Sequence, residues 1–252
     1  MPWAGLRLAV TLLTAVPLQG APATGRPPSR TAVRAALYWA PMIGLAIGAA
    51  AAGVLLLASR VGHTGSLLAA VLAVVTMVAL TRALHLDGLA DLADGLGSRK
   101  PAAQALEIMR RSDIGPFGVV TLLLTLLVQV SALAQAEQIG RGPVAVAAAA
   151  VAARLGITLA CRRSVPSARL AGLGALVAGT VQPAVAAILA LAALAAAAAF
   201  GWIYPVAMAI GLAASLALTK LAIRRLGGVT GDVLGAVAEL TVAACLLVTA
   251  IR

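Results

Sequence analysis

The chain has 252 residues, of which 62% are hydrophobic and only 11% are charged. Soluble domains are about 45–50% apolar and about 25% charged, so this composition excludes a water-soluble globule, a disordered chain and a disulfide scaffold. The formal net charge is +11, which in a soluble protein would indicate nucleic acid. In a membrane protein the excess of Lys and Arg belongs to cytoplasmic loops, so we expect the lipid bilayer as partner and no nucleic acid. The two cysteines, Cys161 and Cys245, lie in apolar segments and are expected to be core residues.

The first 34 residues resemble a signal peptide in part, with Arg7, the apolar run Leu8–Leu18 and then small residues. The run is too short to span a bilayer, and Arg26, Arg30 and Arg34 would hinder translocation of the segment that follows. A short interfacial helix is therefore favoured over a cleaved signal.

Long uncharged tracts predict an all-α, polytopic transmembrane helical bundle, because a spanning helix needs about 20 mostly apolar residues. We expect seven spans, at residues 37–58, 66–84, 116–136, 143–161, 183–200, 204–222 and 232–250. The chain is thus expected to form one integral-membrane domain over 1–252. Residues 1–34 would supply the interfacial helix and a cytoplasmic segment, and 35–252 the bundle.

Loops rich and poor in Lys and Arg alternate along these spans. The rich loops precede residue 37 and cover 85–115, 162–182 and 220–231, whereas the turns near residues 60, 141 and 202 hold one basic residue or none. Since basic loops face the cytoplasm, we expect a cytoplasmic N-terminus, cytoplasmic motif loops and a location in the inner cell membrane.

Three of the eight carboxylates lie close together, at Asp87, Asp91 and Asp94. Their i, i+4, i+7 spacing places them on one arc of a helix, where like charges repel. Oxygen ligands next to phosphates suit Mg²⁺, so we expect a Mg²⁺ site; the alternative is a solvated helix face. His85 directly precedes the cluster. It could orient a carboxylate or a substrate phosphate; the alternative is an ordinary interfacial histidine.

A second acidic segment starts with a glycine-rich run. Gly228, Thr230 and Gly231 precede Asp232 at an expected helix start, where backbone N–H groups can bind phosphate oxygens. The alternative is an ordinary turn with a capping residue.

Two charges are expected inside the membrane. Glu239 and Arg154 each lie about 10 Å below the cytoplasmic ends of their spans, and charges at such depth are usually functional or paired. We expect them to pair directly or through bound substrate, the alternative for Arg154 being snorkelling to the interface.

At these residues the sequence resembles the cobalamin synthase (adenosylcobinamide-GDP ribazoletransferase) family. The matching segments, in order, are Leu12–Pro17, His85–Leu96, Ala105–Arg110 with Gly115–Gly118, Arg154 with Pro166–Arg169, and Gly228–Glu239. They cover essentially the whole chain. One departure is Arg111, which stands where the family usually has Asp; Asp113, two residues later, either takes over that role or helps to position substrate.

The resemblance implies the last assembly step of cobalamin biosynthesis, with Mg²⁺ as cofactor. The 3′-hydroxyl of α-ribazole, or of its 5′-phosphate, would attack the phosphoryl group that carries cobinamide in adenosylcobinamide-GDP, releasing GMP and forming adenosylcobalamin or its 5′-phosphate. The expected catalytic residues are Asp87, Asp91, Asp94, Asp232 and Glu239, the first three as metal ligands. The expected substrate-binding residues are His85, Arg110, Asp113, Arg154, Arg169, Gly228, Thr230 and Gly231. The sequence favours no oligomeric state.

Two other functions fit parts of the pattern. A CDP-alcohol phosphotransferase also uses spaced Asp and Gly with a divalent metal, but its pattern has Ala-Arg after the first Gly, whereas Ala90 is followed here by Asp91. A cation transporter would use the acids as a permeation path. It predicts acids near mid-membrane or on both sides, yet six of the eight are expected on the cytoplasmic side.

Overall fold

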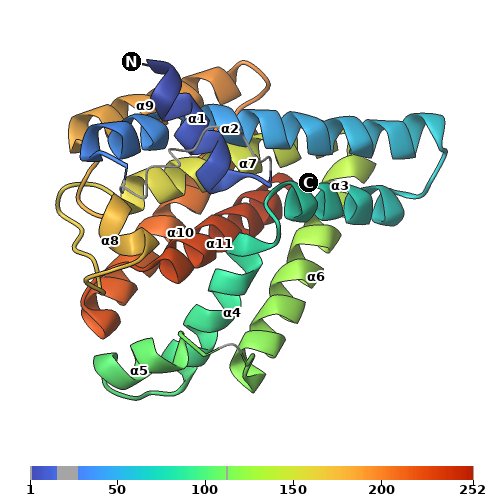
Figure 1. Cartoon of the computed structure of the whole chain (residues 1–252). Helices are drawn as coiled ribbons and strands as arrows, with labels where there is room; N and C mark the ends of the chain where they lie inside the picture. The colour runs from blue at the N-terminus through green and yellow to red at the C-terminus, as the bar shows by residue number, and fades with distance from the viewer. Residues whose placement is uncertain (1, 16–27, 112, 252) are drawn as a thin grey trace.

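The computed structural model of the chain describes residues 2–15, 28–111 and 113–251, and it is a helical bundle (Figure 1). No strand occurs in these residues, and their β-structure is limited to two isolated bridges. The elements are α1 (Pro2–Leu13), α2 (Arg30–Leu56) with the π-helical turn η1 (Leu57–Val61), α3 (Ser66–Leu80), α4 (Leu84–Gly97), α5 (Ala102–Ile108), α6 (Pro116–Gln138), α7 (Gly142–Ala160), α8 (Leu173–Val177), α9 (Pro183–Ala198), α10 (Ile203–Leu226) and α11 (Gly231–Thr249).

Five helices are long and apolar enough to cross a membrane, namely α2 with η1, α6, α7, α10 and α11. Helices α3 and α4 reach that length only together, and they are bent by 88° at a short break. Helix α9, the predicted fifth span, is apolar but has 16 residues. The predicted multi-pass helical bundle is therefore confirmed. Five helices could span a membrane, or six if the bent pair counts as one, compared with the seven spans predicted. The short helix α1 packs along α2, and the possible cleavage site after it lies outside the described residues.

The break between α3 and α4 has an unusual backbone. Arg82 and Ala83 adopt φ values of 52° and 56°, the left-handed region that costs residues with a Cβ roughly 1–2 kcal/mol each. These two residues turn the chain so that α4 leaves α3 and runs beside α6 and α11 (Figure 1). The acidic helix is thus directed by a strained turn.

Small residues allow the central helices α2 and α7 to approach each other closely. A Cβ on Gly48 of α2 would lie 2.7 Å from the Cα of Ala147 on α7. Nearer the start of α2, the hydroxyl of Thr158 donates to the carbonyl oxygen of Leu37 at 2.9 Å. Cys161 and Cys245 are buried and free, so neither is exposed for chemistry.

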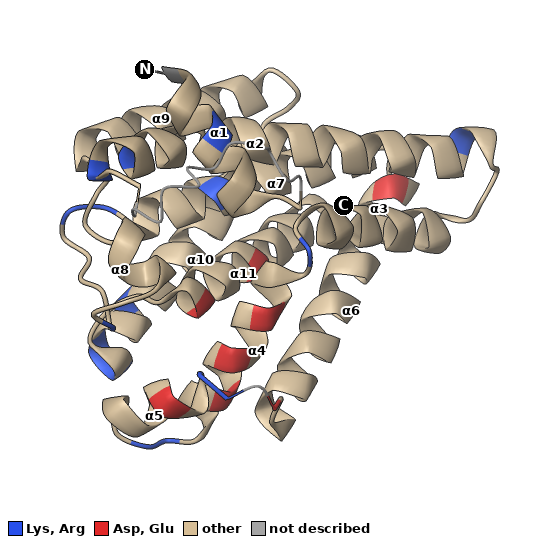
Figure 2. Cartoon of the chain, in the orientation of Figure 1, with Lys and Arg blue, Asp and Glu red and all other residues tan. Residues whose placement is uncertain are grey.

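Charges are unevenly distributed over the bundle (Figure 2). Basic residues gather at the end where α2 begins at Arg30, where Arg162 and Arg163 follow α7, and where α10 ends with Arg224 and Arg225. Most of the acidic residues lie on α4 and in the first half of α11, whereas Glu107 lies on α5 and Glu137 near the end of α6. This grouping agrees with the predicted sorting of basic loops to one side of the membrane; the sidedness itself stays a prediction.

Candidate active site

Two glycines bring the acidic helix α4 into backbone contact with α11. A Cβ on Gly88 would lie 2.8 Å from the Cα and carbonyl oxygen of Asp232, and a Cβ on Gly235 would lie 2.9 Å from the carbonyl oxygen of His85. Only residues without side chains permit such an approach. The contact gathers the two acidic segments, which lie far apart in the sequence, into one site.

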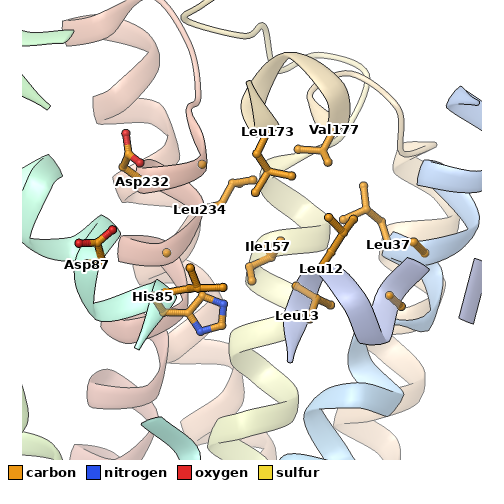
Figure 3. Close-up of a pocket in the computed structure, with 15 residues that line it drawn as sticks. Leu12, Leu13, Leu37, His85, Asp87, Ile157, Leu173, Val177, Asp232 and Leu234 are labelled. Carbon is orange, nitrogen blue, oxygen red and sulfur yellow. The ribbon is translucent and has the colours of Figure 1, made fainter. Parts of the chain in front are cut away.

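Three carboxylates surround this contact. Asp87 and Asp232 border the same cavity (Figure 3), and Asp91 lies close enough to both for their charges to act on it. Asp87 is exposed, whereas Asp91 and Asp232 are half-buried. The site therefore presents a concentration of negative charge that a cation would stabilise.

The carboxylates of this site are the kind of ligand that Mg²⁺ has in enzymes that act on phosphates. Hard carboxylate oxygens are available from Asp87 and Asp91, and Mg²⁺ is commonly held by one or two carboxylates together with substrate phosphates and waters. Among the described residues, no three His, Cys, Asp or Glu side chains are placed to hold a metal ion by themselves. The arrangement thus fits a metal that is completed by the substrate.

Asp94 has a partner that the sequence did not predict. Its buried carboxylate accepts hydrogen bonds from the backbone N–H groups of Gly115 at 2.7 Å and Gly118 at 2.9 Å. Helix α6 has no capping side chain of its own, so Asp94 caps it from α4 and interacts favourably with its dipole. A Cβ on either glycine would collide with this carboxylate. The structure gives Asp94 a capping role, and its proposed role as a metal ligand stays untested.

Arg169 connects the site to α5. Its guanidinium forms an ion pair with Asp232 (Nη1 to Oδ2, 3.5 Å) and donates from Nη2 to the carbonyl oxygen of Leu106 at 2.8 Å. The buried Nε atom has no partner. The structure thus brings Arg169, a predicted substrate-binding residue, against Asp232, and the arginine places positive charge at the edge of the acidic cluster.

The glycine-rich run before α11 is shaped by pairing with another loop. Val229 donates to the carbonyl oxygen of Pro166 and accepts from Ala168, at 2.9 and 3.0 Å, and a side chain on Gly228 would collide with this loop. Thr230 caps α11 by accepting from the N–H of Val233 at 3.2 Å and donates to Asp232 at 3.1 Å. The alternative interpretation, a tight turn with a helix cap, accounts for these contacts. Gly231 still borders the cavity.

Arg154 and Glu239 are both buried, at 2% and 8% exposure, but they form no direct ion pair. Gln129 of α6 instead donates to Glu239 Oε2 at 2.8 Å, while Nε and Nη2 of Arg154 have no hydrogen-bond partner. The charge of Glu239 nonetheless acts on Arg154. Direct pairing is therefore not observed, and Gln129 holds one oxygen of the carboxylate instead; pairing through bound substrate stays a prediction. Snorkelling of Arg154 is wrong, since its side chain is buried.

The remaining predicted residues fall into two environments. His85 is 8% exposed and borders the cavity beside Asp87. Arg110 and Asp113 are exposed in the segment between α5 and α6, and neither forms a hydrogen bond or ion pair with the described part of the acidic cluster. The structure therefore brings His85 into the site and leaves Arg110 and Asp113 on the surface near it.

Sequence reasoning missed Gln129, Gly115 and Gly118 as contributors to these contacts. Gln129 is 1% exposed, and an amide in an otherwise apolar span was the available signal, because a buried amide requires a partner. The two glycines had been noticed only as part of a motif.

Comparison with known proteins gives consistent results. The sequence model of a family described as cobalamin-5-phosphate synthase matches residues 5–250. A protein of Frankia casuarinae named adenosylcobinamide-GDP ribazoletransferase is 43% identical, over 97% of this chain and 93% of its own length. Relatives of the same name from Bradyrhizobium diazoefficiens and a Nocardioides species are 39% and 37% identical over 98% of the chain, covering 93% and 98% of their own lengths. No solved structure matches the chain.

Proposed function

The chain belongs to the cobalamin-5-phosphate synthase family, and we propose that it is the enzyme that joins adenosylcobinamide-GDP and α-ribazole, the final assembly step of cobalamin synthesis. In this reaction the ribazole 3′-hydroxyl forms a P–O bond to the phosphorus that carries cobinamide, and the P–O bond to GMP breaks. The 5′-phosphate of α-ribazole would serve as acceptor in the same way and give adenosylcobalamin 5′-phosphate.

The observation that supports this function is the gathering of Asp87, Asp91 and Asp232 at the α4–α11 contact, beside a cavity. Phosphoryl transfer depends mainly on positioning and charge neutralisation. Asp87 and Asp91 would hold Mg²⁺ against the diphosphate, and the bound metal supplies neutralisation of the phosphate oxygens and of the departing GMP.

The chain's own groups supply the remaining functions. Arg169 is fixed between Leu106 and Asp232, so its guanidinium can hold a further phosphate oxygen without reorganising. Asp232 borders the same cavity as Asp87 and is placed to accept the proton of the attacking hydroxyl. Asp94 holds α4 on α6 through the N–H groups of Gly115 and Gly118 and would thereby position the two carboxylates proposed to bind the metal.

We further propose that this site faces the cytoplasm, where nucleotide substrates are available. The basic residues at the start of α2, after α7 and at the end of α10 support that orientation, because loops rich in Lys and Arg stay inside.

The test is a reconstituted assay of purified protein with adenosylcobinamide-GDP and α-ribazole, in which GMP and the cobalamin product are both measured. We expect release of both products to require Mg²⁺ and the acceptor. Replacing adenosylcobinamide-GDP by a CDP-alcohol distinguishes the mechanistically related phosphotransferases. Turnover with the CDP-alcohol, or no GMP from adenosylcobinamide-GDP under any metal condition, contradicts the proposal.

A further inference from the structure

A cavity of about 230 Å³ lies directly beside the acidic cluster. Its walls come from α1, α2, α4, α7, α8 and α11, so segments from the first and last parts of the sequence line it together (Figure 3). Asp87 and Asp232 lie on one side, and Leu12 and Leu37 of α1 and α2 lie opposite (Figure 3). The cavity therefore connects the proposed reaction centre to an apolar interior.

The lining of the cavity is divided into a polar and an apolar part. Its polar side chains are His85, Asp87 and Asp232, and the other lining residues are aliphatic or glycine. The side chain of His85 is only 8% exposed and points into this space (Figure 3). It makes no hydrogen bond to the described residues. An apolar group with a polar end suits such a lining, because a few placed polar groups fix orientation while aliphatic walls supply burial.

The volume of the cavity indicates which part of the proposed substrates could fit into it. Sites for whole drug-sized ligands occupy ~300–1,000 Å³, so 230 Å³ is too small for a corrin macrocycle or an entire nucleotide. A flat bicyclic aromatic ring is the part of the substrates that combines small size with an apolar surface. Guanine carries several hydrogen-bonding groups that the aliphatic walls would leave unsatisfied.

We propose that this cavity binds the benzimidazole base of α-ribazole, an inference that rests on the proposed function. With the base among Leu37, Ile157 and Val177, the ribose lies at the polar end, where its hydroxyl reaches Asp87 and Asp232. His85 hydrogen-bonds the nucleoside there and acts as a positioning residue. A lipid acyl chain is the competing occupant, but it would leave the buried side chain of His85 without a hydrogen-bond partner.

The test fills the cavity. Ile157 is 3% exposed and lies in its middle, so Ile157→Trp should exclude the base. The matched control is Ile188→Trp, on α9 at 63% exposure and away from the lining. Steady-state KM is measured for each substrate separately, and binding of radiolabelled α-ribazole is measured by equilibrium dialysis without the second substrate.

We expect Ile157→Trp to raise the KM for α-ribazole and its dissociation constant at least about tenfold, the equivalent of one lost contact of modest strength. The KM for adenosylcobinamide-GDP should stay at the wild-type value, and Ile188→Trp should change neither. Because a buried Trp can prevent folding, Ile157→Ala provides a second variant. This variant enlarges the cavity, so it should bind α-ribazole more weakly than the wild type does. A nucleoside with a larger base should lose less affinity than α-ribazole loses.

Different results identify different failures. If the wild-type protein releases no GMP, the proposed function fails. If the wild type is active but the folded cavity variants keep the wild-type KM and dissociation constant for α-ribazole, the cavity inference alone is overturned. An equal rise in both KM values also overturns it. Native mass spectrometry that finds a phospholipid on the wild type, absent from Ile157→Trp with an unchanged ribazole KM, identifies a lipid site instead.

Discussion

The carboxylate of Asp94 on α4 receives the N–H group of Gly115 at 2.7 Å, and this hydrogen bond, with that from Gly118, fastens the acidic helix to the first turn of α6. The two segments belong to different motifs of the sequence, and these hydrogen bonds join them in the structure. Asp94 and its neighbour Asp91, three residues earlier, therefore contribute differently, one to the framework and one to the charge of the site.

This difference can be separated by experiment. Asp94→Asn leaves one carbonyl oxygen in place of two accepting oxygens and removes the charge, so we expect a loss of about 1–2 kcal/mol in the free energy of unfolding. Asp87→Asn changes an exposed group and should leave stability within about 0.5 kcal/mol. Thermal unfolding in a constant detergent measures both. Equal destabilisation by the two changes would show that Asp94 has no special capping role.

Activity should respond in the opposite order. Asp87→Asn and Asp91→Asn each remove a proposed metal ligand, and the loss of one group that stabilises transition-state charge costs about 100–1,000-fold in turnover. The apparent affinity for Mg²⁺ should fall as well. The measurement is GMP release over a titration of Mg²⁺, with the Glu107→Gln variant, altered at an exposed acid on α5, as the control. Near-normal turnover of both Asp variants at limiting Mg²⁺ would contradict the metal site.

The contact between α4 and α11 can be tested with a methyl group. In Gly88→Ala the new Cβ would lie 2.8 Å from backbone atoms of Asp232, and backbone has little freedom to move aside. We expect a destabilisation of about 1–3 kcal/mol together with a loss of activity, because Asp87 and Asp232 are pushed apart.

The control is Gly53→Ala on α2, where a Cβ would have no neighbour within 4 Å. In a helix that change should stabilise by roughly 0.5–1 kcal/mol. Unfolding and activity assays on the two variants should therefore diverge; similar effects from both would mean that the close approach at Gly88 is not required.

Topology provides a prediction that is independent of activity. The native Cys161 and Cys245 are buried, so single introduced cysteines can be labelled against a silent background. Lys100→Cys, in the exposed turn after α4, should react only from the cytoplasmic side, and His63→Cys, in the exposed turn after η1, only from outside. Reaction of both from the same side would contradict the assignment of membrane crossings between these turns.

The features that could be predicted from the sequence were those that depend on local patterns of hydrophobic and charged residues. The apolar tracts became the helices, and the acids at positions 87, 91 and 232 did meet. Contacts formed by backbone atoms of distant segments were not predictable in this way, since the hydrogen bonds of Asp94 reach residues 115 and 118 and leave no mark on the periodicity of α4. The bend at Arg82 and Ala83 was missed because neither residue is of a type that usually adopts positive φ. The strand-like pairing of Val229 with the 166–168 loop likewise depends on tertiary placement.

The buried pair of charges gives the last prediction. Arg154 has two nitrogens without hydrogen-bond partners, and Glu239 is held by Gln129, yet the two charges act on each other across the interior. Arg154→Met removes the only guanidinium that offsets the carboxylate of Glu239 within the described interior of the bundle, and Glu239→Gln leaves the arginine charge uncompensated. Because an uncompensated buried charge is costly, we expect each single change to destabilise and the double change to cost less than their sum.

A double-mutant cycle on thermal stability in detergent measures this coupling, which should exceed about 0.5 kcal/mol. Gln129→Leu is the further control: it removes the hydrogen bond but no charge, so its effect should add to that of Arg154→Met. Additive effects in the Arg154–Glu239 cycle would show that the two charges are independent and that each is compensated by neutral dipoles around it.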